Sequence, residues 1–395
     1  MRTKSDQDVL IVDAVRSPIG RRKGGLSTFH SADLLGAVLA ELVNRSGIDA
    51  GHVGQVIGGC VGQVGQQGFN ITRTAWLTAG LPISVPATTI DSQCGSSQQA
   101  VTLAHGLLAG GLVDVAVACG VEVMSRVPLG ATLSVGVGKA KPRSYFPQYE
   151  YTTQFEAAEM IAKKWQITRA DTDQLGLESQ QRAAVAWADG RFDSQVVAVD
   201  APVLDENDRP TGEVHRVDRD ECLRESTLGG LAGLKLLDEN GVHTAGTSSQ
   251  IADAASAVLL TTRKRADELG LTPRARVVDS CLVGGDPTLM LTEPINATRT
   301  LLDRNGLTID DIDIVEINEA FASVVLAWER EIKPDHSRVN PNGGAIAMGH
   351  ALGSTGCVLT TKALYELERQ ASARALVTMC CGGGLGTGTL LEREQ

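Results

Sequence analysis

The chain has 395 residues, of which 43% are hydrophobic and 21% are charged, a composition typical of a globular protein large enough for two or three domains. Its formal net charge is −11 and it has no basic run, which excludes a nucleic-acid-binding protein that relies on clustered Lys and Arg. No apolar run approaches the length of a membrane span, so we expect a cytoplasmic protein with no membrane contact.

The first 120 residues alternate between apolar, β-branched runs and segments with helical period. This alternation predicts an α/β fold with a parallel or mixed sheet covered by helices. One helix, over 31–46, has Ser31 as its candidate N-cap and Gly47 past its end. The expected strands are 9–18, 55–61, a short one from 88 and 113–120, and the other expected helices are 69–79 and 95–109.

Neither the basic residues nor the cysteines indicate a bound ion. The eight cysteines form no CxxC pair, so we expect reduced thiols and no metal site. The densest basic cluster is interpreted as a solvated loop rather than an anion contact. Its members are Arg16, Arg21, Arg22 and Lys23.

The stretch 126–245 interrupts the alternation, because it is more charged and less regular than the residues before it. It holds two amphipathic helices, near 156–165 and 171–189, between polar segments. We interpret it as an inserted subdomain, after which the regular pattern resumes at 251–260.

The C-terminal part repeats the order of the N-terminal part, which predicts two similar halves rather than a solenoid. The correspondences pair 274–284 with the opening strand, 310–322 with 52–62, the helix near 354–369 with the helix after Cys94, and 374–384 with 113–120.

Cys94 stands in DSQCGSSQQA, directly before a predicted helix. Unpaired N–H groups and the helix dipole stabilise a thiolate at such a position. The small residues Gly95, Ser96 and Ser97 leave room for a substrate carbonyl close to the backbone. The alternative is a buried, inert thiol, and the local sequence does not separate the two.

His350 lies in the Gly-rich segment 340–356, which also leads into a predicted helix. The segment contains neither of the nucleotide-loop patterns GxxxxGK[ST] and GxGxxG. We therefore interpret it as a tight backbone that holds His350 against a ligand, with a structural histidine as the alternative.

Cys380 precedes a run of glycines at the end of an apolar strand, where the backbone can approach a ligand closely. Asn318 and Glu319 end an earlier apolar strand, and they are either helix caps or polar groups aimed into a site. Because sites in open α/β sheets form at the ends of strands, we expect these side chains to meet Cys94 and His350.

Together these motifs resemble those of the thiolases, in order and over essentially the whole chain, and most closely the degradative type found in actinobacteria. The matching segments are that around Cys94, NEAFA (318–322), GGAIAMGH (343–350), CCGGG (380–384), GVEVMSRVP (120–128) and TAGTSSQIADAASAVLL (244–260).

The resemblance implies a thiolase-like fold, in which two βαβαβ-type halves form a five-layer α/β/α/β/α core. The N-terminal half then comprises 1–120 plus 249–273, and the C-terminal half 274–395. The inserted loop domain, 121–248, covers the coenzyme A site. Coenzyme A is a co-substrate, no cofactor is bound permanently, no metal is required, and the chain forms a homodimer or homotetramer.

Residue by residue, the resemblance implies that Cys94 is the acylated nucleophile, His350 the base that activates it and Cys380 the second acid/base. Asn318 holds a water that forms one oxyanion hole with His350. The backbone N–H groups of Cys94 and Gly382 form the other.

The implied reaction is ping-pong cleavage of a 3-ketoacyl-CoA by coenzyme A to acetyl-CoA, or propionyl-CoA, and a shortened acyl-CoA. Fatty-acid or steroid-type degradation is the expected setting, and the alternative is a biosynthetic acetoacetyl-CoA thiolase that condenses two acetyl-CoA molecules. Ser249 matches a contact of the pantetheine arm, and Arg224 approaches the coenzyme A nucleotide.

Three departures from the family pattern affect these expectations. Ser97 stands where Gly is usual, and Ala351 replaces a Pro, which removes a turn constraint but no catalytic group. The segment TTQFEAAEM (152–160) lacks the Met-Gly pair of short-chain members. The changed wall at Gln154 and Phe155 favours a larger 3-ketoacyl group than acetoacetyl, branched or ring-derived.

Three other functions compete with this one. A ketoacyl synthase or hydroxymethylglutaryl-CoA synthase lacks a cysteine in the place of Cys380. A non-catalytic acyl-CoA-binding relative is expected to have lost Cys94 or His350, and neither is lost. An oxidoreductase needs a dinucleotide fingerprint after the first strand, which this chain lacks.

Overall fold

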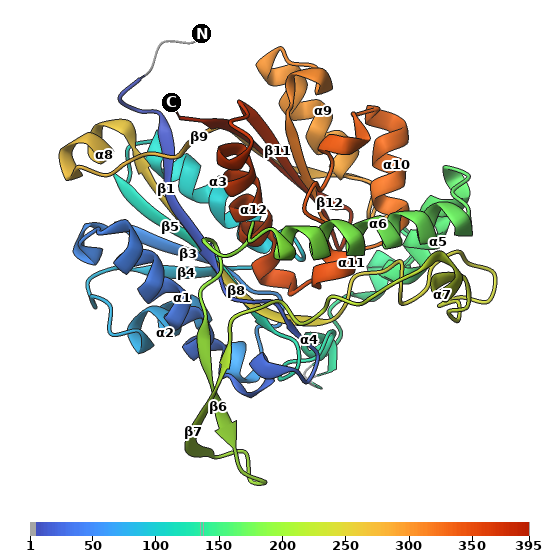
Figure 1. Ribbon diagram of the computed structural model, residues 1–395, viewed down its shortest axis with the longest axis horizontal. Coiled ribbons are helices and arrows are strands. Elements are labelled where there is room, and N and C mark those ends of the chain that lie inside the picture. Colours follow the sequence, from blue (N-terminus) through green and yellow to red (C-terminus); the bar gives the residue numbers. More distant parts are fainter. Residues whose placement is uncertain (1–4, 135, 137, 395) are drawn as a thin grey trace.

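The computed structural model describes residues 5–134, 136 and 138–394 (Figure 1). Within these ranges the main sheet has ten strands, nine of them in the order β10-β11-β12-β9-β1-β8-β5-β3-β4, with β2 beside β8. The strands are β1 Val9–Arg16, β2 Gly20–Arg21, β3 Gln55–Gly59, β4 Ala87–Ile90, β5 Val115–Val123, β8 Ala252–Thr262, β9 Ala275–Gly284, β10 Ile314–Ile317, β11 Arg374–Cys381 and β12 Leu385–Arg393, while β6 Val199–Leu204 and β7 Pro210–Val217 form a separate hairpin.

The same strand pattern occurs twice in the main sheet. β3 and β5 are parallel, and β8 and then β1 follow in antiparallel order. β10 and β11 are likewise parallel, and β12 and then β9 follow in antiparallel order. The two half-sheets join through only two residue pairs between β1 and β9, Leu10–Arg276 and Ile11–Ala275. The predicted internal repeat and the mixed α/β fold are therefore confirmed.

Helices cover both half-sheets and separate them. The helices are α1 Ser31–Ser46, α2 Ile71–Thr78, α3 Ser96–Ala109, α4 Ala131–Ser134, α5 Gln154–Lys164, α6 Arg169–Ala188, α7 Leu228–Ala232, α8 Arg263–Leu269, α9 Pro294–Asn305, α10 Ala322–Ile332, α11 Ala345–Met348 and α12 Thr355–Arg369. One apolar cluster joins α1 and α2 to the N-terminal half-sheet, and another joins α9 and α10 to the C-terminal one. A third cluster, between them, contains α3 and α12, which completes the five layers.

The layering places the starts of the two central helices near the ends of parallel strands. β5 follows α3 in the chain, and β11 follows α12. Buried residues of both strands contribute to the central cluster together with α3 and α12. The loops that carry Cys94 and His350 lead directly into α3 and α12. Both loops therefore open at the same region of the molecule, as the sequence predicts for strand and helix ends in an α/β sheet.

Several local predictions need correction. The N-cap of α1 is His30, whose ring accepts the N–H of Ala32, and Ser31 is the first helical residue. Gly47 does end this helix, in the left-handed conformation. The hairpin of β6 and β7 was not predicted, because β7 is polar and exposed in all but its last residue and the apolar residues of β6 are interrupted by Asp200 and Pro202.

Arg16 also differs from the prediction of a solvated basic loop. It is fully buried at the end of β1, where its guanidinium binds both carboxylate oxygens of Asp220, at 2.7 and 3.1 Å, and the side-chain oxygen of Gln195, at 3.0 Å. Arg21 and Arg22 are exposed, as expected. The Asp220 carboxylate further accepts N–H bonds from Ile19 and from the Trp187 indole, so this buried charge pair is fully hydrogen-bonded.

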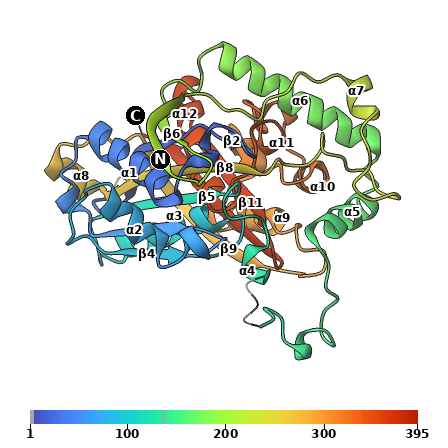
Figure 2. The same ribbon diagram turned by 90° about the horizontal axis from the view of Figure 1, so that it is seen from below.

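Residues 124–251 connect β5 to β8, and we call them the connection. It contains the expected helices, α5 and α6, and α6 packs across α11. Figure 1 shows the β6–β7 hairpin projecting from the body, and Figure 2 shows that the described residues 138–153, which precede α5, extend away from it. Among the helices of the described ranges, none combines the length and apolar character needed to cross a bilayer.

Candidate active site

Cys94 lies in a tight turn immediately before α3. The carboxylate of Asp91 accepts the N–H of Gln93 at 2.7 Å, and Gln93 has a positive φ of 54°. Gly95 then caps the helix in contact with β11 and β12, because a Cβ at this position would lie 2.5 Å from the sulfur of Cys381. Only glycine fits there, and the turn therefore holds Cys94 against the C-terminal half.

The thiol of Cys94 is nearly buried, and burial raises its pKa to about 11. The backbone N–H groups of Gly382 and of Cys94 itself hydrogen-bond the sulfur and act in the opposite direction, lowering this pKa. The sequence argument foresaw stabilisation of the thiolate, but it could not foresee that burial outweighs it. Cys94 is therefore a neutral thiol at pH 7, and a base must remove its proton before it attacks.

His350 is held in a fixed position between α11 and α12. Its backbone N–H donates to the carbonyl of Gln250 at 2.9 Å, which binds the loop to the start of β8. On the ring, Nδ1 lies 2.7 Å from the hydroxyl of Thr355 and Nε2 lies 3.4 Å from the amide nitrogen of Asn318. Burial lowers the pKa of His350 to about 4, so the imidazole is neutral at pH 7 and able to accept a proton.

Asn318 and Glu319 follow β10 and face different surroundings. The Asn318 N–H donates to the carbonyl of Thr378 on β11, and its side-chain oxygen is buried without a hydrogen-bond partner among the described residues. A buried amide oxygen in this state is available to a substrate or a water molecule. The Glu319 carboxylate instead accepts bonds from Ser179 and from the backbone of Ile346 in α11, and so holds the Gly-rich segment in place.

Cys380 and Cys381 end β11 on opposite faces of the strand. Cys381 packs beside Cys94 in the central cluster, whereas Cys380 packs with Met290 and Phe321 in a separate apolar cluster. Burial raises the pKa of Cys380 far above its usual range, and the charge of a Cys94 thiolate raises it further. The two sulfurs are thus close enough to interact electrostatically. Gly382, the residue after the strand, is half-buried and turns its N–H toward Cys94.

The loops from the two halves meet through close backbone contact. A Cβ at Gly120, in β5, would lie 2.2 Å from the carbonyl of Gly353, so the turn before α12 rests directly on β5. Ser97, in the first turn of α3, accepts the backbone N–H of Cys357 in α12 at 2.9 Å. The hydroxyl thereby satisfies an N–H in the first turn of the facing helix, which otherwise has no intrahelical partner.

A buried carboxylate that the sequence analysis did not single out connects these loops. Glu122, at the end of β5, accepts the backbone N–H groups of Val61, Gly62 and Gly353, each at 3.0 Å, and the side-chain amide of Gln67 at 2.6 Å. Burial is the main effect on its pKa, which is raised. A lone Glu inside an apolar strand was the only signal available, and it does not reveal which N–H groups surround it.

Two further residues lie on the connection, at different depths. Ser249 is half-buried, and its N–H donates to the carbonyl of Ala320, two residues after Asn318 in the same segment. Its neighbour Ile251 pairs with His350, which places Ser249 close to the site. Arg224 is exposed, and its guanidinium donates to the carbonyl of Ala245 at 3.1 Å, while its backbone N–H donates to Gln180 at 2.9 Å. Its side chain thus forms no recorded bond with Cys94, His350, Asn318 or Cys380 among the described residues.

The geometry thus joins a thiol, a neutral imidazole, an amide and a second thiol. Sequence profiles of the thiolase N-terminal and C-terminal domains match residues 9–264 and 271–393. The chain belongs to the thiolase family. This thiolase is an acyltransferase, of the class that uses coenzyme A as a substrate.

Its relatives cover almost its full length. The thiolase is 44% identical to a steroid 3-ketoacyl-CoA thiolase of Mycobacterium tuberculosis over 98% of this chain and 94% of that protein. It is 41% identical to a 3-oxoadipyl-CoA/3-oxo-5,6-dehydrosuberyl-CoA thiolase of Escherichia coli, over 98% and 100%. The crystal structure of an acetyl-CoA acetyltransferase of Bacillus anthracis superimposes with a TM-score of 0.88 at 33% identity, over 98% of this chain and 99% of that one.

The apolar cluster that contains Cys380 is bordered by aromatic side chains in this thiolase. Phe321 belongs to the same apolar cluster as Cys380, and its ring meets that of Phe155 edge to face at 5.5 Å. Phe155 lies in the first turn of α5 and is 47% exposed. Gln154 precedes it as the first residue of that helix, so the segment that departs from the short-chain pattern does border the cluster that holds Cys380.

Proposed function

We propose that this thiolase cleaves a 3-ketoacyl-CoA with coenzyme A in a degradative pathway, releasing acetyl-CoA or propionyl-CoA and a shortened acyl-CoA. The observation that carries the proposal is the position of Cys380. Cys380 ends β11 two residues before Gly382, whose N–H bonds the Cys94 sulfur, so a second buried thiol is available as the proton-transfer group that carbon–carbon cleavage requires. The relatives from Mycobacterium tuberculosis and Escherichia coli are named as thiolases of a steroid 3-ketoacyl-CoA and of 3-oxoadipyl-CoA/3-oxo-5,6-dehydrosuberyl-CoA, and these names support a 3-ketoacyl-CoA substrate.

In the first half-reaction, Nε2 of His350 takes the proton of Cys94, and the sulfur attacks the 3-keto carbon of the substrate. The bond between C2 and C3 then breaks. The electron pair goes to C2 as the enolate of acetyl-CoA, which takes the proton of Cys380. Acetyl-CoA leaves, and the shortened acyl group stays on Cys94 as a thioester.

In the second half-reaction, the thiol of coenzyme A gives its proton to the Cys380 thiolate and attacks the thioester carbonyl. Cys94 leaves as a thiolate and recovers its proton from His350. Each attack forms an oxyanion. We assign the N–H groups of Cys94 and Gly382 to the oxyanion of the acyl group on Cys94, and Asn318 with its water, together with His350, to that of the enolate.

We further propose that residues 121–248 form a domain that covers coenzyme A, between halves made of 1–120 plus 249–273 and of 274–395. Ser249 suits a contact with the pantetheine arm, since it lies beside the strand end that carries Asn318. Arg224 suits the nucleotide end, because its charge is exposed on the same connection. A homodimer or homotetramer is the proposed assembly.

The substrate that we propose carries an acyl group larger than acetoacetyl. The edge-to-face pair of Phe155 and Phe321 gives the cluster around Cys380 a broad apolar border, which suits a branched or ring-derived group. Condensation of two acetyl-CoA molecules is the second candidate. The observation that favours it is the structural match to an acetyl-CoA acetyltransferase. The same catalytic residues serve cleavage and condensation, so the site alone does not separate the two directions.

A thiolysis panel tests the proposal. The purified enzyme is given coenzyme A and acetoacetyl-, 3-ketooctanoyl-, 3-ketohexadecanoyl- or 3-oxoadipyl-CoA, or a 3-ketoacyl-CoA that carries a steroid ring, and product CoA esters are measured by mass spectrometry. We expect kcat/KM to be highest for one of the larger substrates. A preference for acetoacetyl-CoA contradicts the proposed substrate class, and no cleavage of any substrate contradicts thiolysis.

A further inference from the structure

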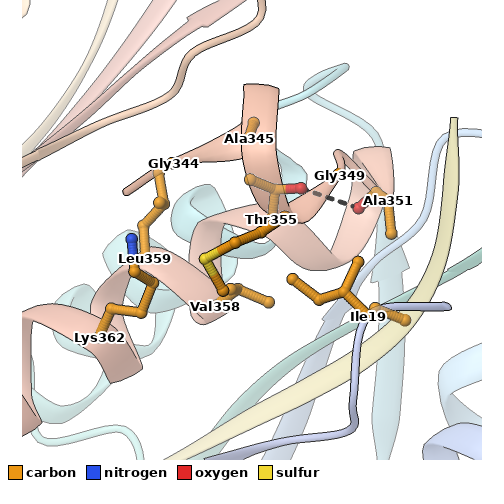
Figure 3. Close-up of a pocket in the computed structure, with 11 residues that line it drawn as sticks. Ile19, Gly344, Ala345, Gly349, Ala351, Thr355, Val358, Leu359 and Lys362 are labelled. Carbon is orange, nitrogen blue, oxygen red and sulfur yellow. Dashed lines mark hydrogen bonds between the residues drawn. The ribbon is translucent and has the colours of Figure 1, made fainter. Parts of the chain in front are cut away.

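The first residue of α12, Thr355, contacts the ring of His350. Its hydroxyl lies 2.7 Å from Nδ1 of His350 and 3.0 Å from the carbonyl oxygen of Ala351. Figure 3 shows the bond to Ala351 and places Thr355 on the wall of a small pocket behind the histidine loop. A threonine hydroxyl has a single hydrogen, so it donates to one of these two partners and accepts from the other.

Two other threonines of the same helix indicate where that hydrogen points. The buried hydroxyls of Thr360 and Thr361 donate to the carbonyls of Gly356 and Cys357, four residues earlier, at 2.9 and 2.7 Å. Thr355 and Ala351 have the same spacing and a similar distance. The Thr355 hydrogen therefore goes to the carbonyl of Ala351, and its oxygen is left to accept a hydrogen bond from Nδ1 of His350.

Among the described residues, the Thr355 hydroxyl is the hydrogen-bond partner recorded for Nδ1, and the pocket that Thr355 lines holds no second hydroxyl. Its other lining side chains within the described residues are apolar, apart from Lys362, whose ammonium binds Glu316 at 2.7 Å and the carbonyl of Gly343 at 2.6 Å. On the far side of the ring, Nε2 faces the amide nitrogen of Asn318, a donor. A lone pair on Nε2 and a proton on Nδ1 satisfy both contacts.

We propose that Thr355 is a positioning residue that holds His350 with its proton on Nδ1, so that Nε2 is the atom that takes the proton of Cys94. This inference rests on the proposed function for its catalytic meaning, but not for its geometry. Burial keeps the ring neutral at pH 7, so the choice between the two neutral forms decides whether the histidine can act as a base.

The ring can be observed directly by NMR with 15N-labelled histidine, using a His350→Gln variant to assign the signal among the seven histidines. In the wild-type enzyme at pH 7 we expect the proton on Nδ1. In Thr355→Val, which keeps the side-chain shape and loses the hydroxyl, we expect a measurable share of the rings to carry the proton on Nε2, with the Asn318 amide turned so that its unpartnered oxygen accepts it. A wild-type ring protonated on Nε2, or a Thr355→Val ring still protonated only on Nδ1, overturns the proposal whether or not the enzyme is active.

Kinetics supply the second reading, with 3-ketooctanoyl-CoA and coenzyme A as the probe. We expect Thr355→Val to lower kcat by roughly 10²-fold with little change in KM, and Thr355→Ser to restore it, since a positioned base contributes at least about that factor. Thr361→Val removes an equally buried hydroxyl of the same helix that does not touch His350, and is expected to leave kcat within about twofold.

Equal losses in Thr355→Val and Thr361→Val, or a Thr355→Ser variant as slow as Thr355→Val, contradict the proposal, because a role confined to helix stability has those effects. If the wild-type enzyme cleaves no 3-ketoacyl-CoA, the proposed function fails, and the NMR experiment still decides the protonation of His350.

Discussion

The two halves of this thiolase share one strand order, yet each uses its central helix differently. In the N-terminal half, α3 begins at Ser96, two residues after Cys94, so the nucleophile lies at the helix end itself. In the C-terminal half, α12 begins at Thr355, five residues after His350, and this threonine carries the hydrogen bond from the helix to the base. The first helix thus presents a reactive atom, and the second orients one.

Cys94 and the residues of the C-terminal half are also held in place by different kinds of interaction. Cys94 is held by backbone N–H groups, and its reactivity depends on its own protonation. His350, Asn318 and Cys380 come from three separate loops or strands of the C-terminal half, and their arrangement depends on side-chain hydrogen bonds and packing. The comparison teaches that two halves with one strand order supply two helix starts, and that the different turns before these helices give each start its own chemistry.

The largest effect is expected from removing the nucleophile. Cys94→Ser should lower the rate of thiolysis by at least roughly 10⁴-fold, because a serine hydroxyl is a much weaker acid than a thiol and His350 is too weak a base to deprotonate it. Cys281→Ser, a buried cysteine of β9 packed against α9, serves as the control and should retain turnover. Intact mass after incubation with substrate should show an acyl adduct on the wild-type and Cys281→Ser proteins alone. A Cys94→Ser variant with normal turnover contradicts covalent catalysis.

The pH dependence of Cys94 modification tests the protonation state of the same thiol. Because burial raises its pKa to about 11, the reactive thiolate is scarce at pH 7 and increases as the pH rises toward that value. Alkylation of Cys94 by iodoacetamide, followed by peptide mass mapping, should accelerate about tenfold per pH unit, or roughly 10³-fold from pH 7 to 10. A rate that levels off below pH 8 would show a thiolate stabilised far more than the geometry indicates.

A somewhat smaller loss is expected in the C-terminal half. Asn318→Ala removes the amide that faces His350, and kcat should fall by about 10²- to 10³-fold, as when one oxyanion-hole donor is lost. Asn296→Ala is the control, since that exposed amide binds only Glu293 in the described structure. If Asn318→Ala changes KM alone, the residue contributes to binding and not to the transition state.

The smallest effect concerns the contact between the halves. In Glu122→Gln, an amide NH2 replaces one carboxylate oxygen and faces N–H donors from Val61 and Gly353, or Gly62 and Gln67. We expect the free energy of unfolding to fall by about 2 kcal/mol in urea titrations. The pKa of Cys94 should fall slightly, since the Glu122 charge raises it. Unchanged stability would mean that the halves hold together without this carboxylate.

Much of this arrangement follows from sequence patterns. Apolar period predicts the central strands and helices, and motif order predicts that Cys94, His350 and Cys380 come from ends of elements that meet. The roles assigned to them remain predictions until they are measured. Patterns fail where a side chain's partner is distant in the chain. The sequence around Arg16 does not predict its partner Asp220, 204 residues away, and the sequence around Glu122 does not predict its contact with Gly353.

Thr355 shows a different limit. It lies within the Gly-rich motif, but helix propensity and burial do not predict to which of two neighbouring groups its hydroxyl donates its hydrogen. That choice depends on a carbonyl four residues earlier and on a ring five residues earlier, both fixed only when the turn has formed. The cap of α1 by His30 is a similar case, because Ser31 is the better N-cap by residue type.

The buried pair of Arg16 and Asp220 has a consequence for how thiolases can be re-engineered. Arg16 belongs to the first strand, whereas Asp220 and Gln195 belong to the connection. A connection grafted from a relative to change substrate range would leave Arg16 as an uncompensated interior charge unless the graft brought both partners with it. The segment is therefore not a free-standing module, and chimeras should be cut so that β1 and the connection come from the same parent.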